Sequence, residues 1–114
     1  MKLLTYARES VLLGDAAADG LMAYAARLAS LRLTDAVRLR VLTVGGSSAM
    51  AAFLLTPGVQ LMTVTVESPY AEPDNEAEVA TLRRRTADIV VAVVLEDQGR
   101  DAIFDDIEFA AATS

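Results

Sequence analysis

The sequence predicts one α+β domain, in which two helices cover one face of an antiparallel sheet with a three-stranded meander at its centre. Three observations lead to this fold class. Residues 37–44 and 59–67 alternate between apolar and polar side chains, the period of half-buried strands. Apolar residues between 15 and 32 recur at helical spacing. A chain of 114 residues, of which 54% are hydrophobic, suits one packed core. We expect the domain to span residues 1–109 and residues 110–114 to form a disordered tail.

The N-terminal part of the chain predicts a strand pair followed by a helix. Residues 3–6 and 10–13 are short apolar strings separated by a break, which is typical of a small hairpin or of one bent strand. Asp15 follows Gly14 and has a side chain that commonly caps a helix N-terminus. The helix is expected over residues 15–32, because its apolar residues share one face. Members of that face are Ala17, Leu21, Tyr24, Ala25, Leu28 and Leu31.

The stretch TVGGSSAM at 43–50 predicts the tip of a β-hairpin. Gly45 and Gly46 suit a two-residue turn with positive φ, and such a turn pairs Val41 with Met50. In this register one face of the hairpin is wholly apolar, and a slip of one residue would disrupt it. The residues of that face are Val37, Leu39, Val41, Met50, Ala52 and Leu54.

Two other structures compete for the same stretch, a strand–loop–helix unit and a phosphate-binding loop. AMAAFLL contains good helix formers, but a helix there would end before Pro57 and would have no polar face. The glycines match neither the P-loop pattern nor the dinucleotide-binding pattern, and no lysine is near them. The hairpin is therefore preferred.

The rest of the chain predicts a third strand of the meander and a second helix. TPG at 56–58 is a turn signal, so residues 59–67 are expected to pair with the preceding strand. Asp74 or Asn75 caps a helix over 74–86, with acidic residues in its first turns and arginines near its end. The β-branched run at 88–95 indicates a buried strand, with continuation of the helix as the alternative. Residues 101–109 fit either a helix or an edge strand.

Composition argues against most enzymes. The chain has no histidine and no cysteine, so it lacks the commonest general base, the commonest metal ligand and any thiol nucleophile. We therefore expect a protein without catalytic activity, cofactor or metal. No segment has the features of a signal peptide or the length of a membrane span, which predicts a cytoplasmic protein without a membrane partner.

Charge is concentrated in the C-terminal half. Residues 67–114 carry twelve carboxylates and four arginines, and the whole chain has a net charge of −6. Such a protein is a poor general binder of nucleic acid, whose phosphates demand positive charge. The acidic half is expected to be a solvated surface or to dock on a basic protein partner. Its carboxylates do not have the spacing of a calcium-binding EF-hand loop.

Six residues are candidates for an interface. In the predicted hairpin register they share the face opposite the apolar one, where two arginines edge an apolar strip. This strip is covered either by helices of the same chain or by another subunit, and arginine is enriched at contacts of the second kind. The candidates are Arg38, Arg40, Leu42, Val44, Phe53 and Leu55.

The run GDAAADGLMAYA at 14–25, together with FLLTPGVQL at 53–61, resembles short uncharacterised proteins of high-GC actinobacteria. That resemblance implies a bacterial source and carries no activity. From the residues themselves we expect a small non-enzymatic protein that acts through protein–protein contacts, as a homodimer. The alternative is a small-molecule-binding domain with a pocket between helix and sheet near Tyr24 and Tyr70.

Overall fold

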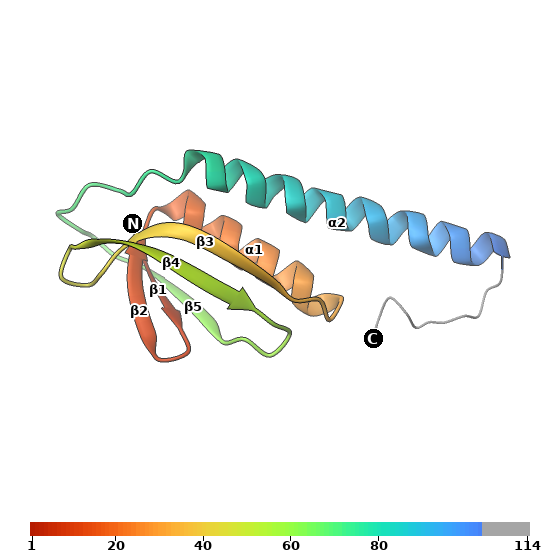
Figure 1. Ribbon diagram of the computed structural model, residues 1–114, viewed down its shortest axis with the longest axis horizontal. Helices are drawn as coiled ribbons and strands as arrows, with labels where there is room; N and C mark the ends of the chain where they lie inside the picture. The colour runs from red at the N-terminus through yellow and green to blue at the C-terminus, as the bar shows by residue number, and fades with distance from the viewer. Residues whose placement is uncertain (104–114) are drawn as a thin grey trace.

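The computed structural model describes residues 1–103, with side chains described as far as Ile89, and has the predicted α+β fold (Figure 1). A five-stranded antiparallel sheet is combined with two helices, and the strand order is β4-β3-β2-β1-β5. The elements in chain order are β1 (Lys2–Tyr6), β2 (Glu9–Leu13), α1 (Asp15–Ser30), β3 (Asp35–Leu42), β4 (Ser48–Leu55), β5 (Leu61–Thr65) and α2 (Glu76–Ile103). The expected tail at 110–114 lies outside the described residues.

The N-terminal strand pair is confirmed as a hairpin. β1 and β2 pair from Lys2 opposite Leu13 to Tyr6 opposite Glu9, so a two-residue turn joins them. Ala7, the first residue of this turn, has a φ of 58°. A positive φ is what the tight turns of hairpins require, and it matches the twist of the strands.

Helix α1 is confirmed, but the predicted cap is wrong. Gly14 occupies the N-cap position, and its carbonyl accepts the first helical hydrogen bond from Ala18 N–H at 3.0 Å. Asp15 is the first helical residue, where its carboxylate lies 3.1 Å from the terminal amino group of Met1. A carboxylate in the first turn still complements the helix dipole. The predicted apolar stripe is buried from Ala17 to Leu28.

The hairpin of β3 and β4 is confirmed, and its predicted register is wrong by one residue. Val41 lies opposite Ala49, and Arg40 lies opposite Met50. The cause is the turn, because Thr43 N–H bonds to the Ser47 carbonyl at 2.8 Å and leaves three residues in the loop. Gly46 ends that loop with a φ of 94°, the left-handed residue typical of three-residue hairpin loops.

The corrected register changes which residues of β4 are buried. Phe53 and Leu55 lie in the core, with 4% and 0% of their surface exposed, while Met50 and Leu54 are half exposed on the other face. An aromatic ring and a leucine fill the core beside the ring of Tyr6, whose centroid lies 5.6 Å from that of Phe53.

The predicted central meander is also wrong. β5 pairs with β1 and lies at the edge of the sheet opposite β4. The sheet curls, so that the end of β4 approaches the end of β1 and the hydroxyl of Tyr6 donates to the Leu54 carbonyl at 2.7 Å. The short connection after β4 therefore reaches the free edge of β1, which provides a full five-residue ladder for β5.

Helix α2 is one long helix, so the predicted strand at 88–95 is wrong and its alternative is confirmed. No glycine or proline interrupts the segment between Glu76 and Gln98, so nothing in the backbone stops the helix after the arginines. Its first turns pack mainly along α1, where Val79 and Leu82 join the core. Of the expected segment 101–109, residues up to Ile103 are helical and the others lie outside the described part of the chain.

Candidate functional site

The corrected fold divides the six predicted interface residues. Exposed are Arg38, Arg40 and Val44; buried are Leu42, Phe53 and Leu55. The prediction that Phe53 and Leu55 lie on the same face as the two arginines was wrong. The three-residue loop shifts the register, so that both side chains point into the core. Val44, in contrast, is 62% exposed at the tip of the hairpin.

Strand β3 has two edges with different partners. The backbone N–H and carbonyl groups of its odd-numbered residues point toward β4, as the hydrogen bond between Thr43 N–H and the Ser47 carbonyl shows. In a strand the backbone groups of successive residues point to opposite edges, so the even-numbered residues point away from β4. β2 would be the natural partner on that side, but the two strands share a single pair, Leu12 opposite Leu42. Within residues 1–103, most of this edge of β3 has no strand beside it.

Beside the Leu12–Leu42 pair, the side chain of Asn75 bonds to the backbone of Arg40, where a neighbouring strand would otherwise bond. Its Oδ1 accepts a hydrogen bond from Arg40 N–H, and its Nδ2 donates to the Arg40 carbonyl, both at 2.8 Å. These are the two bonds that a residue of an antiparallel strand would make. Asn75 is 4% exposed and is a buried polar residue of the described part of the chain. Its side chain therefore satisfies two backbone groups that burial would otherwise leave unpaired.

The start of α2 is held to β3 by several further contacts. The guanidinium of Arg40 donates to the Asp74 carbonyl at 3.2 Å and forms an ion pair with Glu78 at 3.1 Å. Both residues predicted to cap α2 take part at its start: Asn75 occupies the N-cap position, and the carboxylate of Asp74 accepts from Glu76 N–H at 3.1 Å. The Asn75 side chain is thereby free for β3, while its carbonyl accepts from Val79 N–H at 2.8 Å as the helix begins.

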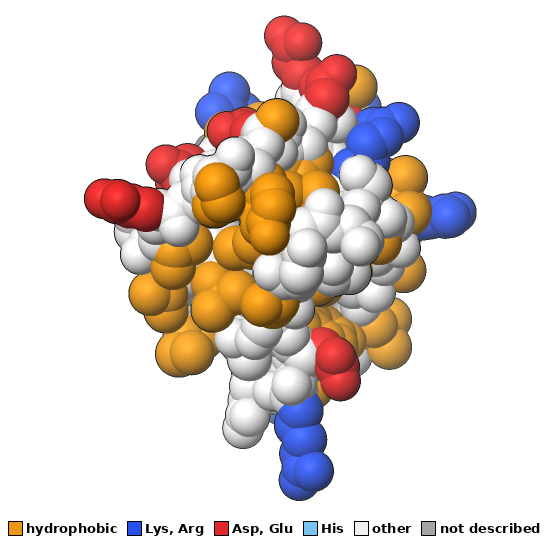
Figure 2. Space-filling model, turned by 90° about the vertical axis from the view of Figure 1, so that its left-hand side faces the viewer, with side chains coloured by type: hydrophobic (Ala, Val, Ile, Leu, Met, Phe, Trp, Pro, Cys, Tyr) orange, Lys and Arg blue, Asp and Glu red, His pale blue; other side chains and the backbone are white. Residues whose placement is uncertain are grey.

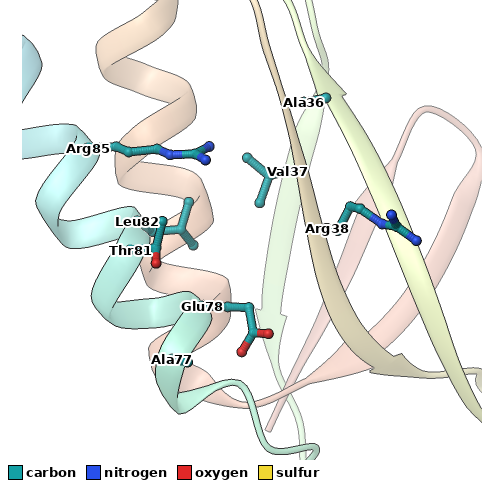
Figure 3. A pocket seen from close by; sticks show the side chains of 8 residues that line it. All are labelled: Ala36, Val37, Arg38, Ala77, Glu78, Thr81, Leu82 and Arg85. Atoms are coloured by element: carbon teal, nitrogen blue, oxygen red, sulfur yellow. The ribbon is translucent and has the colours of Figure 1, made fainter.

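Beyond Asn75 the edge of β3 opens into a cleft. Ala36 N–H bonds to the carboxylate of the neighbouring Asp35 at 2.8 Å. Within residues 1–89 nothing bonds to the N–H or carbonyl of Arg38, which lies between Ala36 and Arg40. The cleft has a volume of about 310 Å³ and separates β3 from the first turns of α2 (Figure 3). Its lining residues are Ala36, Val37, Arg38, Ala77, Glu78, Thr81, Leu82 and Arg85.

A polar cluster closes one end of this cleft. The hydroxyl of Tyr24, on α1, donates to the Asp35 carboxylate at 2.5 Å, and Arg85, on α2, contacts the same oxygen at 3.0 Å. The Tyr24 hydrogen bond, with help from Ala36 N–H and Arg85, lowers the pKa of Asp35 below its ordinary value. Burial and the same hydrogen bond raise the pKa of Tyr24. Three elements are thus joined through one carboxylate.

This cluster predicts a loss of stability in acid. Because the pKa of Asp35 is lowered on folding, its contribution is present above the pKa of the unfolded chain, near 4, and is lost as the pH falls further. We expect Asp35→Asn to lower the melting temperature at pH 7 and to reduce its fall between about pH 5 and pH 2. Thermal unfolding of both proteins across this range is the measurement, and equal pH profiles would show that the cluster has no energetic role.

No group of three His, Cys, Asp or Glu side chains within the described residues is close enough to hold a metal ion. Tyr24 is buried against Asp35, whereas Tyr70 lies on the hairpin tip, with its hydroxyl 3.4 Å from the Gly45 carbonyl. Neither tyrosine is among the residues that line the cleft between β3 and α2. No helix of the described chain has the length and hydrophobicity to cross a membrane.

A second exposed surface lies on β4 and the hairpin tip. β4 forms one edge of the sheet, and Met50 and Leu54 on its outer face are 50% and 52% exposed. Figure 2 shows hydrophobic side chains gathered at the end of the molecule that carries the hairpin tip, with charged groups mostly at the margin. Tyr70 and Val44 are exposed at this end. Apolar exposure of this kind is typical of a contact surface.

Sequence reasoning missed both the Asn75 contact and the open edge of β3. Asn75 stands in the polar loop before a helix, where asparagine is ordinarily a cap, and it lies 35 positions from its partner Arg40. The open edge depends on β2 leaving β3 after one pair, which no local pattern encodes.

Comparison of the chain with protein families, with curated proteins and with solved structures gives no match.

Proposed function

We propose that this protein works without catalysis, through protein–protein contacts, as a homodimer joined along β4. The observation that carries the proposal is an unprotected edge strand. β4 is eight residues long, lies at the edge of the sheet, and contains neither a charged residue nor a proline. Exposed edge strands of soluble proteins are usually protected by charges, prolines or bulges, because they readily pair with another chain. A cytoplasmic location is part of the same proposal.

The backbone of β4 is ready for such pairing over its N-terminal half. Since the odd-numbered residues bond to β3, the N–H and carbonyl groups of Ser48, Met50 and Ala52 point outward. The next outward carbonyl, that of Leu54, is already bonded to Tyr6. Two copies related by a two-fold axis therefore gain most hydrogen bonds when the axis passes beside Met50.

This register also buries apolar surface. Ser48 of each copy faces Ala52 of the other, and the two Met50 side chains meet at the axis. Each Met50 is half exposed in the single chain, and methionine packs easily against irregular apolar surfaces. A symmetric contact of one strand with itself is the ordinary way to close a dimer without leaving a growing edge.

A single introduced cysteine tests this dimer directly. The chain has no cysteine of its own, so Met50→Cys carries one thiol per copy. Directly opposed residues that exchange both hydrogen bonds have Cα atoms about 5.5 Å apart, a distance that a disulfide spans. Under mild oxidation we expect most of the Met50→Cys protein to migrate as a disulfide-linked dimer on a non-reducing gel.

Met62→Cys is the matched control. Met62 is 55% exposed, a value close to that of Met50, but it lies on β5 at the other edge of the sheet. We expect its cross-linking to be slow and to depend on random collision. Equal rates for the two variants, together with a monomeric mass for the unmodified protein in light scattering at tens of micromolar, would refute the β4 dimer.

A further inference from the structure

We propose that the cleft between β3 and α2 binds an extended peptide segment of a partner protein, which adds to β3 as an antiparallel strand. The segment places an acidic side chain beside Arg38 on the outer face and an aliphatic side chain in the cleft above Val37 and Leu82. This site uses the edge of β3 that faces away from β4, so it does not depend on the dimer.

Along this edge the backbone groups on either side of Arg38 have hydrogen-bond partners, including Ala36 N–H, which bonds to the Asp35 carboxylate. Leu42 pairs with Leu12 of β2, and Arg40 pairs with the side-chain amide of Asn75. Arg38 comes next in the same row, and within residues 1–89 its N–H and carbonyl have no protein partner. One residue of an extended peptide can bond to both groups, because its carbonyl accepts from Arg38 N–H and its own N–H donates to the Arg38 carbonyl. The side chain of Asn75 makes the same two bonds at Arg40.

The cleft gives room for the peptide and for one apolar side chain. Its volume of about 310 Å³ is at the lower end of the range for ligand sites. Figure 3 shows Val37 directed toward α2 and Arg85 extending from α2 toward β3. Val37 and Leu82 form an apolar floor, with 6% and 2% of their surfaces exposed. In an added strand, the residues before and after the one opposite Arg38 point to this inner side.

Charge favours an acidic residue opposite Arg38. Arg40 is paired with Glu78 and Arg85 with Asp35. Arg38 is exposed on the outer face of β3, where Figure 3 shows its side chain directed away from α2, and no ion pair is found for it among residues 1–89. A cross-strand neighbour lies on the same face at about 5 Å, so a carboxylate there completes an ion pair.

The test uses a capped pentapeptide, acetyl-Thr-Val-Asp-Val-Thr-amide, and the full chain labelled with ¹⁵N. At about 1 mM peptide, the concentration scale of weak specific binding, we expect saturable shifts of the amide signals of Arg38 and its neighbours and slower exchange of the Arg38 amide hydrogen. N-methylation of the peptide aspartate removes the donor to the Arg38 carbonyl. We expect it to weaken binding about tenfold, which corresponds to about 1.4 kcal/mol.

Protein variants locate the site and test its charge preference. Ala77→Phe places a ring in the cleft and is expected to abolish binding, while Ala80→Phe, on an exposed position of α2 that does not line the cleft, leaves it unchanged. Arg38→Glu is expected to weaken the aspartate peptide and to strengthen a peptide with lysine in its place. The proposal fails if Arg38 shows no saturable shift, if N-methylation has no effect, or if Ala77→Phe binds as well as Ala80→Phe.

Discussion

Replacing Asn75 with alanine is expected to destabilise the fold by about 2–4 kcal/mol, a large effect for a residue in a surface loop. The substitution removes both hydrogen bonds to the backbone of Arg40, each 2.8 Å long, at a position that is 4% exposed. The N–H and carbonyl of Arg40 then remain partly buried without partners, and each unsatisfied group costs about 1–3 kcal/mol. Urea denaturation followed by circular dichroism measures the difference in the free energy of unfolding.

Two neighbouring variants separate this role from ordinary helix capping. Asp74→Ala removes the 3.1 Å contact with Glu76 N–H and should cost about 1 kcal/mol, as the loss of a cap does. Asn75→Asp keeps an acceptor for Arg40 N–H but brings a carboxylate against the Arg40 carbonyl, so its cost should be close to that of Asn75→Ala. If Asn75→Ala costs no more than Asp74→Ala, Asn75 does not act in place of a strand.

The parts of the fold that could be predicted are those encoded by neighbouring residues. The β1–β2 hairpin follows from two apolar strings and a short break, and α1 follows from a stripe that recurs at helical spacing. In both elements the spacing of apolar residues within the segment itself determines which side is buried. The α+β class follows from these elements together.

The hairpin of β3 and β4 shows where local patterns become ambiguous. Two glycines in a row are compatible with a loop of two or of three residues, and the two loops differ by one residue in register. The expectation that a slip of one residue would disrupt the apolar face was wrong, because residues 49–55 are all apolar and either register gives β4 an apolar inner face. Only contact with the rest of the core, including the ring of Tyr6, selects the register that buries Phe53 and Leu55.

The candidate site could not be predicted because its contacts join distant parts of the chain. Asn75 reaches β3 across 35 positions, and Arg85 reaches Asp35 across 50. The position of β5 beside β1 depends on the curl of the sheet, which brings the ends of β4 and β1 together. Of the predicted interface residues, Arg38 lines the cleft, whereas Phe53 and Leu55 form part of the core.

The central claim is that the backbone groups along one edge of β3 bond to β4, while along the other edge those of Arg40 bond to Asn75 and those of Arg38 have no partner among residues 1–89. Amide hydrogen exchange of the free protein, followed residue by residue by NMR, tests it most directly. We expect slow exchange at Val37, Leu39 and Val41, which face β4, and at Arg40, which is bonded to Asn75. Arg38 should exchange faster than these by about a hundredfold or more, because its amide needs no opening of the fold. Slow exchange at Arg38 together with fast exchange at Leu39 and Val41 would contradict the account, since a two-residue turn would produce that pattern.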